Sequence, residues 1–527
     1  MNYILPPGIT RVIDPSQPQV AQLNEQSIVF KVNNLPDGDA RVTYKNVELD
    51  LRQYKKLKMF VHAEALPDED LNDLDLSAFI RIGSDYKDNF YEYEVPLVLT
   101  AHRNNYDNDD DADRLLVWPQ ENVFEIDLEQ FVELKKERDE AVRNNSMLYS
   151  KIRIYSKFDE NNRIKVRGTP NLSNIRTIMI GVRNPGDTDN PNANDGLSKS
   201  AEIWFNELRL TDFNNKGGWA ANARMQTKLA DLGTLSIAGS TIKPGFGGIE
   251  QKVEQRKKEE LLQYDISSNI ELGKLFPEKS NVSIPMFVGV SKSIINPEYY
   301  PKEPDRLLKE VLKEAESRAR KNEIKEVSQD VMERKSINFT NVRVNKEVKK
   351  FRLMSPANLS VSVAYSKENS HNYSVEKDNT IKYRAAINYT YSSRPKNITP
   401  FRKSKKLKSP YLRIIKDFNF NPLPSNFTFR TDFDRNYNEV KMRNVFEDVD
   451  IKIDSTVNKN FLWNRFFDFR WDLTRALKID FSATNVARID EMPGAYDWFR
   501  PGDNKEWSDS VWTNILNGGT NTNYDHS

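Results

Sequence analysis

Length, charge and cysteine content exclude several classes of protein. The chain has 527 residues, enough for two or more domains. Its 78 Lys and Arg residues balance 77 Asp and Glu residues, so the formal net charge is +1 and nucleic acid is not expected as a partner. The absence of cysteine excludes disulfides, thiolate-bound zinc and thiol catalysis.

Hydropathy limits the ways in which the chain could meet a membrane. The mean hydropathy is −0.71 and no run of 18 apolar residues occurs, which excludes a membrane-spanning helix but not a transmembrane β-barrel, whose strands are half polar. The opening sequence MNYILPPGITRVIDPSQPQ lacks a basic region followed by an apolar stretch, so no signal peptide is predicted. If the protein lies outside the cytoplasm, we expect the chain to be a piece of something longer.

The first part of the chain predicts an extended lead-in followed by a β-sandwich. Four prolines in residues 1–26 oppose a helix, so these residues are predicted to be extended. Residues 27–213 carry short strand signals separated by turns rich in Asp, Asn, Gly and Pro, and predict an antiparallel β-sandwich of jelly-roll type. One charged helix is predicted at 128–144. The predicted strands are 27–35, 40–51, 56–66, 77–84, 89–99, 151–158, 175–184 and 201–213.

This sandwich resembles the galactose-binding-like jelly rolls used as carbohydrate-binding modules. The resemblance lies in VELDLRQYKKLKMFVHAE, residues 47–64, and in EIWFNELRL, residues 202–210. It implies sugar binding by exposed aromatic residues or calcium binding by the acidic residues 107–113. The alternative is that the aromatic residues pack on a sheet face and the acidic run is a solvated loop, because the EF-hand spacing is missing. The candidate aromatic residues are Tyr91, Tyr93, Trp118 and Trp204.

After the flexible junction NNKGGW, residues 214–219, the chain becomes a series of aromatic-rich strands. Strands of this kind, joined in meander order, are typical of outer-membrane β-barrels. We therefore predict that residues 214–527 form a partial transmembrane β-barrel. The predicted strands are 232–241, 264–276, 281–293, 336–344, 358–368, 380–393, 426–440 and 461–483, and candidate lipid-facing or girdle aromatics in them include Tyr383, Tyr389, Phe427 and Phe429.

The stretch 461–483 alternates apolar and polar residues without losing phase, and only Arg465 and Arg475 interrupt its apolar parity. The kept phase predicts either one long strand or two strands joined by an odd-length turn. A long ribbon in a soluble sandwich is the alternative to a barrel strand. The candidate lipid-facing or girdle residues are Phe461, Trp463, Phe467, Phe469, Trp471 and Phe481, and the candidate lumen-facing residues are Asp468, Arg470, Asp472, Lys478 and Asp480.

Two helical insertions are predicted between the barrel strands. The long one, 304–335, begins with Pro304 and Asp305, which suit a helix N-terminus. It could bind a partner or lie on the rim of the barrel. A short charged helix is predicted at 253–263. The basic segment 400–418 is predicted to be a loop that leads into a strand, and the alternative is that it meets phosphate-bearing lipid or an acidic partner.

No pattern in the sequence indicates catalysis. The motifs H-E-x-x-H, G-x-S-x-G and G-x-G-x-x-G and the Walker loop are absent, and the four histidines are widely separated. We therefore expect a protein that is not an enzyme and has no cofactor or bound metal.

Finally, the chain resembles the SprA/Sov family, the giant outer-membrane translocons of type IX secretion. The stretches that carry the resemblance include NYILPPGITRVIDPSQPQVAQLNEQS, FIRIGSDYKDNFYEYEVPL, AEIWFNELRLTDF with GGWAA, ERKSINFTNVRV, KSPYLRIIKDFNFNPLPSNFTFRTDFDRNYNEVKMRN and LWNRFFDFRWDLTRALKIDFSATNVARIDE.

The resemblance implies a wide single-chain barrel in the bacterial outer membrane that exports folded cargo and supports gliding motility where present. The implied partners are a smaller outer-membrane shuttle barrel, a periplasmic plug protein, secreted cargo and membrane lipid. Family members are longer, so we expect an internal fragment that neither inserts nor conducts alone, because open strand edges are costly in lipid. The alternative function is that of a secreted or cell-surface carbohydrate-binding or adhesive β-protein.

Overall fold

The computed structural model describes most of the chain and shows a mainly β protein. The described residues are 3–10, 13–14, 21–22, 25–67, 69–101, 106–145, 148–186, 196–251, 255–345, 355–393, 397–404, 409–445, 451–498 and 505–526. Within these ranges, no helix combines the length and the apolar character needed to cross a membrane. Parts of three predicted segments lie outside the described residues, namely positions in the lead-in 1–26, 252–254 and 405–408.

The described chain divides into two compact units, and the division falls within the junction predicted at 214–219. Unit 1 contains the described residues up to Lys216 and a later segment, Tyr299–Val311. Unit 2 contains Gly217–Gln251, Gln255–Glu298 and the residues from Leu312 onward.

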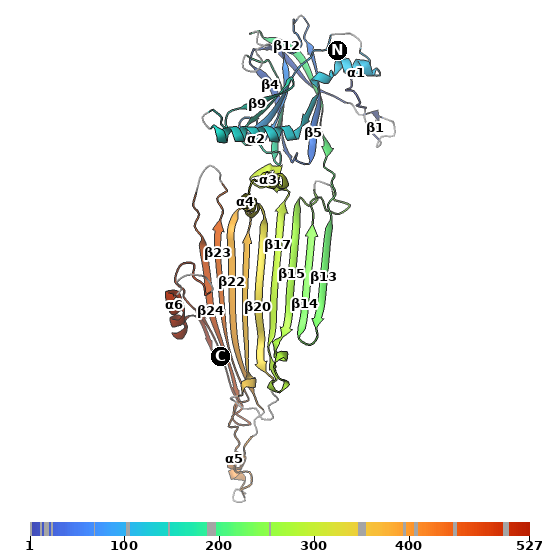
Figure 1. Cartoon of the computed structure of the whole chain (residues 1–527). Coiled ribbons are helices and arrows are strands. Elements are labelled where there is room, and N and C mark those ends of the chain that lie inside the picture. The colour runs from blue at the N-terminus through green and yellow to red at the C-terminus, as the bar shows by residue number, and fades with distance from the viewer. Residues whose placement is uncertain are drawn as a thin grey trace. The chain divides into compact units, whose positions relative to one another are not determined.

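Unit 1 is an antiparallel two-sheet sandwich, which confirms its predicted β character (Figure 1). One sheet has the strand order β4-β11-β6-β7-β10-β9, and the other has the order β3-β12-β5-β8. A separate short pair joins β1 (Ile13–Asp14) to β2 (Ala21–Gln22). The strands of the sandwich are β3 (Ile28–Leu35), β4 (Ala40–Leu49), β5 (Tyr54–Ala65), β6 (Ser77–Gly83), β7 (Phe90–Pro96), β8 (Phe124–Asp127), β9 (Tyr155–Asp159), β10 (Asn162–Arg167), β11 (Ile175–Arg183) and β12 (Lys199–Phe213).

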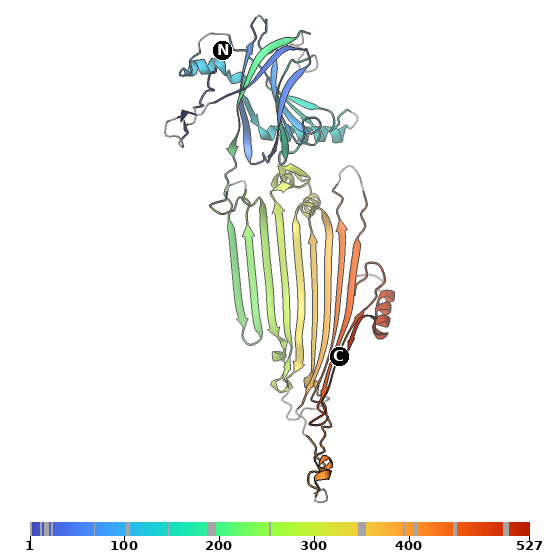
Figure 2. The same cartoon turned by 180° about the vertical axis from the view of Figure 1, so that it is seen from behind.

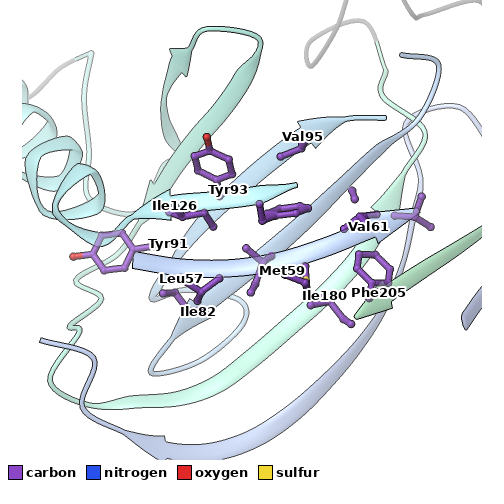
Figure 3. Close-up of a cluster of buried hydrophobic side chains, with 14 of the residues drawn as sticks. Leu57, Met59, Val61, Ile82, Tyr91, Tyr93, Val95, Ile126, Ile180 and Phe205 are labelled. Atoms are coloured by element: carbon purple, nitrogen blue, oxygen red, sulfur yellow. The ribbon is translucent and has the colours of Figure 1, made fainter. Parts of the chain in front are cut away.

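The core of unit 1 lies between the two sheets, because alternate residues of facing strands point inward. Figure 3 shows Leu57 and Met59 of one sheet beside Ile82 and Ile180 of the other, and all four are buried. The helix α2 (Leu128–Asn144) has the predicted bounds and buries Phe131 and Leu134 in this core. Asp127 caps its N-terminus by accepting a hydrogen bond from the backbone N–H of Glu129.

The acidic segment predicted as a loop is partly helical. Residues 107–110 form a turn, and α1 (Asp111–Val117) begins directly after Asp110, whose side chain caps the helix. A short 3-10 helix, η1 (Gln120–Asn122), follows before β8.

The segment Tyr299–Val311 is held in unit 1 by buried polar contacts. It contains the short pair β18 (Tyr299–Tyr300) and β19 (Glu303–Leu307). The carboxylate of Asp305, only 2 % exposed, accepts hydrogen bonds from Lys135 Nζ at 2.8 Å and from the backbone N–H of Leu172 at 2.6 Å. Since an unpaired buried carboxylate is costly, these contacts fix the segment.

Unit 2 is a 12-stranded antiparallel sheet whose strands neighbour one another in chain order (Figures 1 and 2), except that the two-residue strand β16 pairs with β20. Its described strands do not close into a barrel, because β13 and β26 are the two outer strands and do not pair with each other. The strands are β13 (Ala220–Leu229), β14 (Gly233–Ile242), β15 (Glu259–Glu271), β16 (Val282–Ser283), β17 (Pro285–Pro297), β20 (Asp330–Val344), β21 (Leu359–His371), β22 (Val375–Ser392), β23 (Asn426–Met442), β24 (Thr456–Trp471), β25 (Ile479–Arg488) and β26 (Thr520–His526).

The alternating stretch 461–483 is a hairpin and not one long strand. The chain leaves β24 at Trp471 and enters β25 at Ile479, and Phe469 pairs with Phe481. The connection 472–478 has an odd number of residues, which keeps the apolar parity on one face of the sheet. Asp472 and Lys478 therefore lie in the connection, outside the strands in which they were predicted.

The prediction of one long helix at 304–335 is wrong. The segment contains β19, then α3 (Leu308–Glu314) and α4 (Arg318–Ser328), and its last residues belong to β20. The first helix ends at Glu314, and Ser317 caps the second, because its backbone is extended and its hydroxyl accepts a hydrogen bond from the N–H of Arg320. Val331 pairs with Ile294, so strand pairing overrides the local preference of the charged C-terminal part for a helix.

The predicted short helix at 253–263 is also wrong over its described part, since β15 begins at Glu259. Strand pairing with β17 over the whole length of β15 explains this difference. The basic segment 400–418 contains two short helices, η6 (Pro410–Leu412) and α5 (Arg413–Lys416). The remaining helices of unit 2 are η3 (Leu272–Leu275), η4 (Glu278–Ser280), η5 (Pro356–Asn358) and α6 (Lys505–Leu516).

Candidate functional site: the two faces of the sheet in unit 2

Strand register divides the sheet of unit 2 into one apolar and one polar face. Residues directly opposite each other on neighbouring strands point to the same face. Register rows such as Val363–Ala385–Phe433–Trp463 therefore lie on one face, which we call the apolar face. The row Ala364–Arg384–Asp434–Leu462 lies on the other, which we call the polar face.

The apolar face forms a band whose height suits a bilayer. On β24 the band runs from Phe461 to Trp471, and beyond it Lys459 occupies the same face. Ten steps of about 3.3 Å give about 33 Å along the strand, and a tilt of about 40° reduces this to about 25 Å along a membrane normal. On β20 and β21 the band ends at Lys335 and Lys367, which are register partners.

Aromatic residues gather in cross-strand contacts at one end of the apolar face. Ring centroids lie 5.8 Å apart for Tyr389 and Phe427, 4.9 Å for Phe429 and Phe467, and 6.5 Å for Phe427 and Phe469. Trp471 lies 6.2 Å from Phe469. Such pairs stabilise neighbouring strands and are the composition of an aromatic girdle.

The polar face carries paired charges. Arg384 forms an ion pair with Asp434 at 2.7 Å, and Arg430 pairs with Asp432 at 2.8 Å. Arg470 lies opposite Asp480, with its Nε atom 3.6 Å from a carboxylate oxygen. Asp468, also on this face, is exposed.

The connection between β25 and β26 covers part of the apolar face and neutralises a buried arginine there. Arg435, 1 % exposed, donates to Glu491 at 2.9 and 2.8 Å and to Asp497 at 2.7 Å. Its guanidinium lies over the rings of Trp498 and Trp507, with centroid distances of 4.9 and 5.0 Å. A buried charge is tolerated only with such partners, so these bonds fix the connection on the sheet.

Arg465, which interrupts the apolar parity in the sequence, lies under the same connection. Its guanidinium donates to the backbone oxygen of Gly518 at 3.1 Å and to the side chain of Asn485, and it stacks on Trp463 at 4.1 Å. The two arginines of this face are thus placed where residues 489–518 supply acceptors.

A cavity of about 700 Å³ lies between the sheet and α6. The apolar side chains of Val363, Ala385 and Ile387 line it from the sheet, and those of Trp512 and Ile515 line it from the helix. The helix itself is anchored by Trp507 and Val511, which are buried against Phe461.

The structure sorts the predicted lipid-facing residues into two groups. Phe461 is 5 % exposed beneath α6, and Tyr383 donates its hydroxyl proton to Asp497, so protein covers both. Trp463 packs against the same cluster. The other predicted residues lie at the aromatic end of the same face and are half-buried or, in Phe481, exposed, namely Tyr389, Phe427, Phe429, Phe467, Phe469, Trp471 and Phe481. Their contact with lipid stays a prediction.

The aromatic residues considered for sugar binding in unit 1 are buried. Tyr91, Tyr93, Trp118 and Trp204 are all at most 4 % exposed, because they pack in the core or beneath residues 3–5 and α1. Tyr91, Tyr93 and Trp204 lie on strands, whereas Trp118 directly follows α1. No group of three or more metal-ligating side chains with suitable geometry occurs in the described parts of the chain.

Sequence reasoning missed the covering connection. Trp507, Val511 and Ile515 follow one another at a spacing of four, which is a helix signal that could have predicted α6. No local signal pairs Arg435 with Glu491 and Asp497, which lie 56 and 62 residues away.

Comparison with known proteins places the chain in a family. No curated protein matches it. Residues 1–312 match the family model SprA_N, described as a motility related/secretion protein. This match covers more than half of the 527 residues and agrees with the resemblance found in the sequence. The chain therefore belongs to the SprA_N family of motility-related or secretion proteins.

Proposed function

We propose that the chain forms part of the wall of an outer-membrane pore that exports folded proteins in type IX secretion and supports gliding motility where present. The observation that carries the proposal is the apolar band on one face of the unit 2 sheet, in which Arg435 and Arg465 are engaged by protein acceptors, opposite a face of paired charges. In a barrel wall the apolar face contacts lipid and the polar face lines a water-filled lumen.

The open edges of the sheet imply that the proposed pore needs strands beyond those of this sheet. An unpaired strand edge in lipid costs several kcal/mol for each exposed backbone group. The outer edges of β13 and β26 therefore need further strands, which we propose come from other parts of the same protein. The proposed partners are the shuttle barrel, the plug protein and the exported cargo, and the proposed location is the bacterial outer membrane at the cell surface.

Unit 1 is proposed to be a jelly-roll-like domain without a sugar site. Its two-sheet sandwich supports such a fold, whereas the burial of its candidate aromatic residues disfavours carbohydrate binding. The proposed function needs no catalytic residue and no cofactor.

The test compares the same new charge on the two faces. In the full-length protein, Phe469→Lys is expected to destabilise the assembled barrel by about 2–4 kcal/mol if the side chain lies at mid-depth in lipid. Asp468→Lys places lysine one residue away on the polar face, where water solvates it, and is the matched control. The measurement is urea unfolding of the protein in outer-membrane vesicles, followed by heat-dependent gel mobility.

Equal stability of the two variants would contradict a lipid-facing assignment of the Phe469 face. Recovery of the unaltered full-length protein in the soluble fraction would overturn the pore proposal as a whole.

A further inference from the structure

The cavity beneath α6 has two facing apolar walls that protein does not fill. On the sheet side, Val363 is 45 % exposed and Ile387 is 40 % exposed, and on the helix side Trp512 is 54 % exposed. In water, such surface costs about 25 cal/mol for each Å². The walls therefore favour an apolar occupant over water.

Three polar side chains beside the cavity, those of Arg435, Tyr383 and Arg384, already form hydrogen bonds or ion pairs within the protein. The guanidinium of Arg435 is used by Glu491, Asp497 and the backbone oxygen of Tyr496. The hydroxyl of Tyr383 donates to Asp497 at 2.9 Å, and Arg384 pairs with Asp434 on the opposite face.

This lining selects against a peptide occupant. An inserted polypeptide would bring backbone N–H and C=O groups that need partners, whereas a hydrocarbon chain brings none. The volume of about 700 Å³ lies in the range of small-molecule sites, and the lining is continuous with the uncovered apolar face through Ile387 and its neighbour Tyr389.

We propose that this cavity holds an acyl chain of a membrane lipid, wedged between α6 and strands β21 and β22. The proposal rests on the proposed function, since it needs the apolar face to contact a bilayer. Protein contacts then hold helix α6 at Trp507 and Val511, and the acyl chain contacts the exposed Trp512 and the partly buried Ile515.

The test uses the full-length protein in vesicles of phosphatidylethanolamine that carry a photoreactive diazirine in one acyl chain. After irradiation, peptide mass spectrometry locates the lipid adducts. We expect adducts on Trp512 or Ile515 and on Val363 or Ile387, in addition to adducts on uncovered residues such as Phe469.

Two matched variants test the cavity itself. Ala385→Trp fills it from the sheet side and is expected to reduce adducts on α6 by about tenfold, because the new indole occupies the space of the chain. Ala386→Trp is the control, since Ala386 is a register partner of Asp432 on the polar face. If A385W fails to assemble, Ile515→Asn provides a second variant, which places an amide in the cavity and is expected to lower the same adducts.

The pattern of adducts distinguishes a failure of the acyl-chain site from a failure of the proposed membrane face. Adducts on Phe469 and Phe481 but none in the cavity would overturn the acyl-chain site and leave the membrane face standing. An absence of adducts on the whole apolar face would overturn both.

Discussion

At the scale of single residues, His62 shows how burial sets the charge state of a side chain in unit 1. It is fully buried beside Trp118 and Trp204, and its Nδ1 atom lies 2.8 Å from the backbone oxygen of Val117. Its Nε2 atom is buried without a hydrogen-bond partner. Burial lowers the pKa of His62 to about 4, against a partly opposing hydrogen bond to Val117.

This pKa predicts that unit 1 loses stability in mild acid. Because the folded-state pKa lies below the unfolded value of 6.5, the unfolded chain binds the proton first. The contribution of neutral His62 is fully present above pH 6.5 and is lost as the pH falls towards about 4, by about 3 kcal/mol in total.

Urea unfolding followed by tryptophan fluorescence between pH 7 and pH 4.5 measures this loss. The variant His62→Gln is expected to have a flatter profile over the same interval. Glu92, whose pKa is lowered to about 2 by Arg183, Lys165 and Arg81 against the opposing effect of burial, titrates below this window and does not account for the slope. Identical slopes in the two proteins would contradict the assignment to His62.

At the scale of elements, the β25–β26 connection depends on one buried ion cluster. The side chains of Arg435, Glu491 and Asp497 are at most 4 % exposed, so removal of the arginine leaves two carboxylates buried without their partner. Arg435→Leu is expected to destabilise the covering connection by about 3–5 kcal/mol.

Hydrogen exchange of the α6 amides in the full-length protein measures this loss, because destabilisation of the connection lowers the protection of these amides. The matched control is Arg430→Leu on the polar face, where the arginine of the ion pair is 56 % exposed and its removal is expected to cost about 0–1 kcal/mol. Equal protection of α6 in both variants would show that other contacts hold the connection.

At the scale of the whole molecule, the strand order predicts that this 527-residue chain does not form a pore by itself. Its sheet has two outer strands, β13 and β26, with one paired edge each. We expect no stepwise ion conductance when the purified chain is added to planar bilayers, because unpaired edges oppose insertion. Full-length protein is the positive control. Uniform channels formed by the chain alone would indicate that copies pair through their edges, and would contradict this prediction.

Most strands and the faces of the sheet could be predicted from the sequence, because they depend on neighbours a few residues apart. Alternation places Phe467 and Phe469 on one face and Asp468 and Arg470 on the other, whatever the strand pairs with. The helix 128–144 was predictable for the same reason, as its apolar stripe and its Asp127 cap are local.

The remaining features were decided by contacts between residues far apart in the chain. Periodicity allowed either a strand or a turn within 461–483, and the pairing of Phe469 with Phe481 decided for the turn. The last residues of the predicted long helix, 330–335, form part of β20 because they pair with β17.

The sequence by itself therefore determined that this protein is built from amphipathic strands, with one apolar and one polar side. Only the tertiary structure decided which part of the apolar side is covered, since Phe461 and Tyr383 lie under a connection held by Arg435. The physical reason is that strand faces follow from backbone geometry within a few residues, whereas a buried charge finds its partners only after the chain has folded.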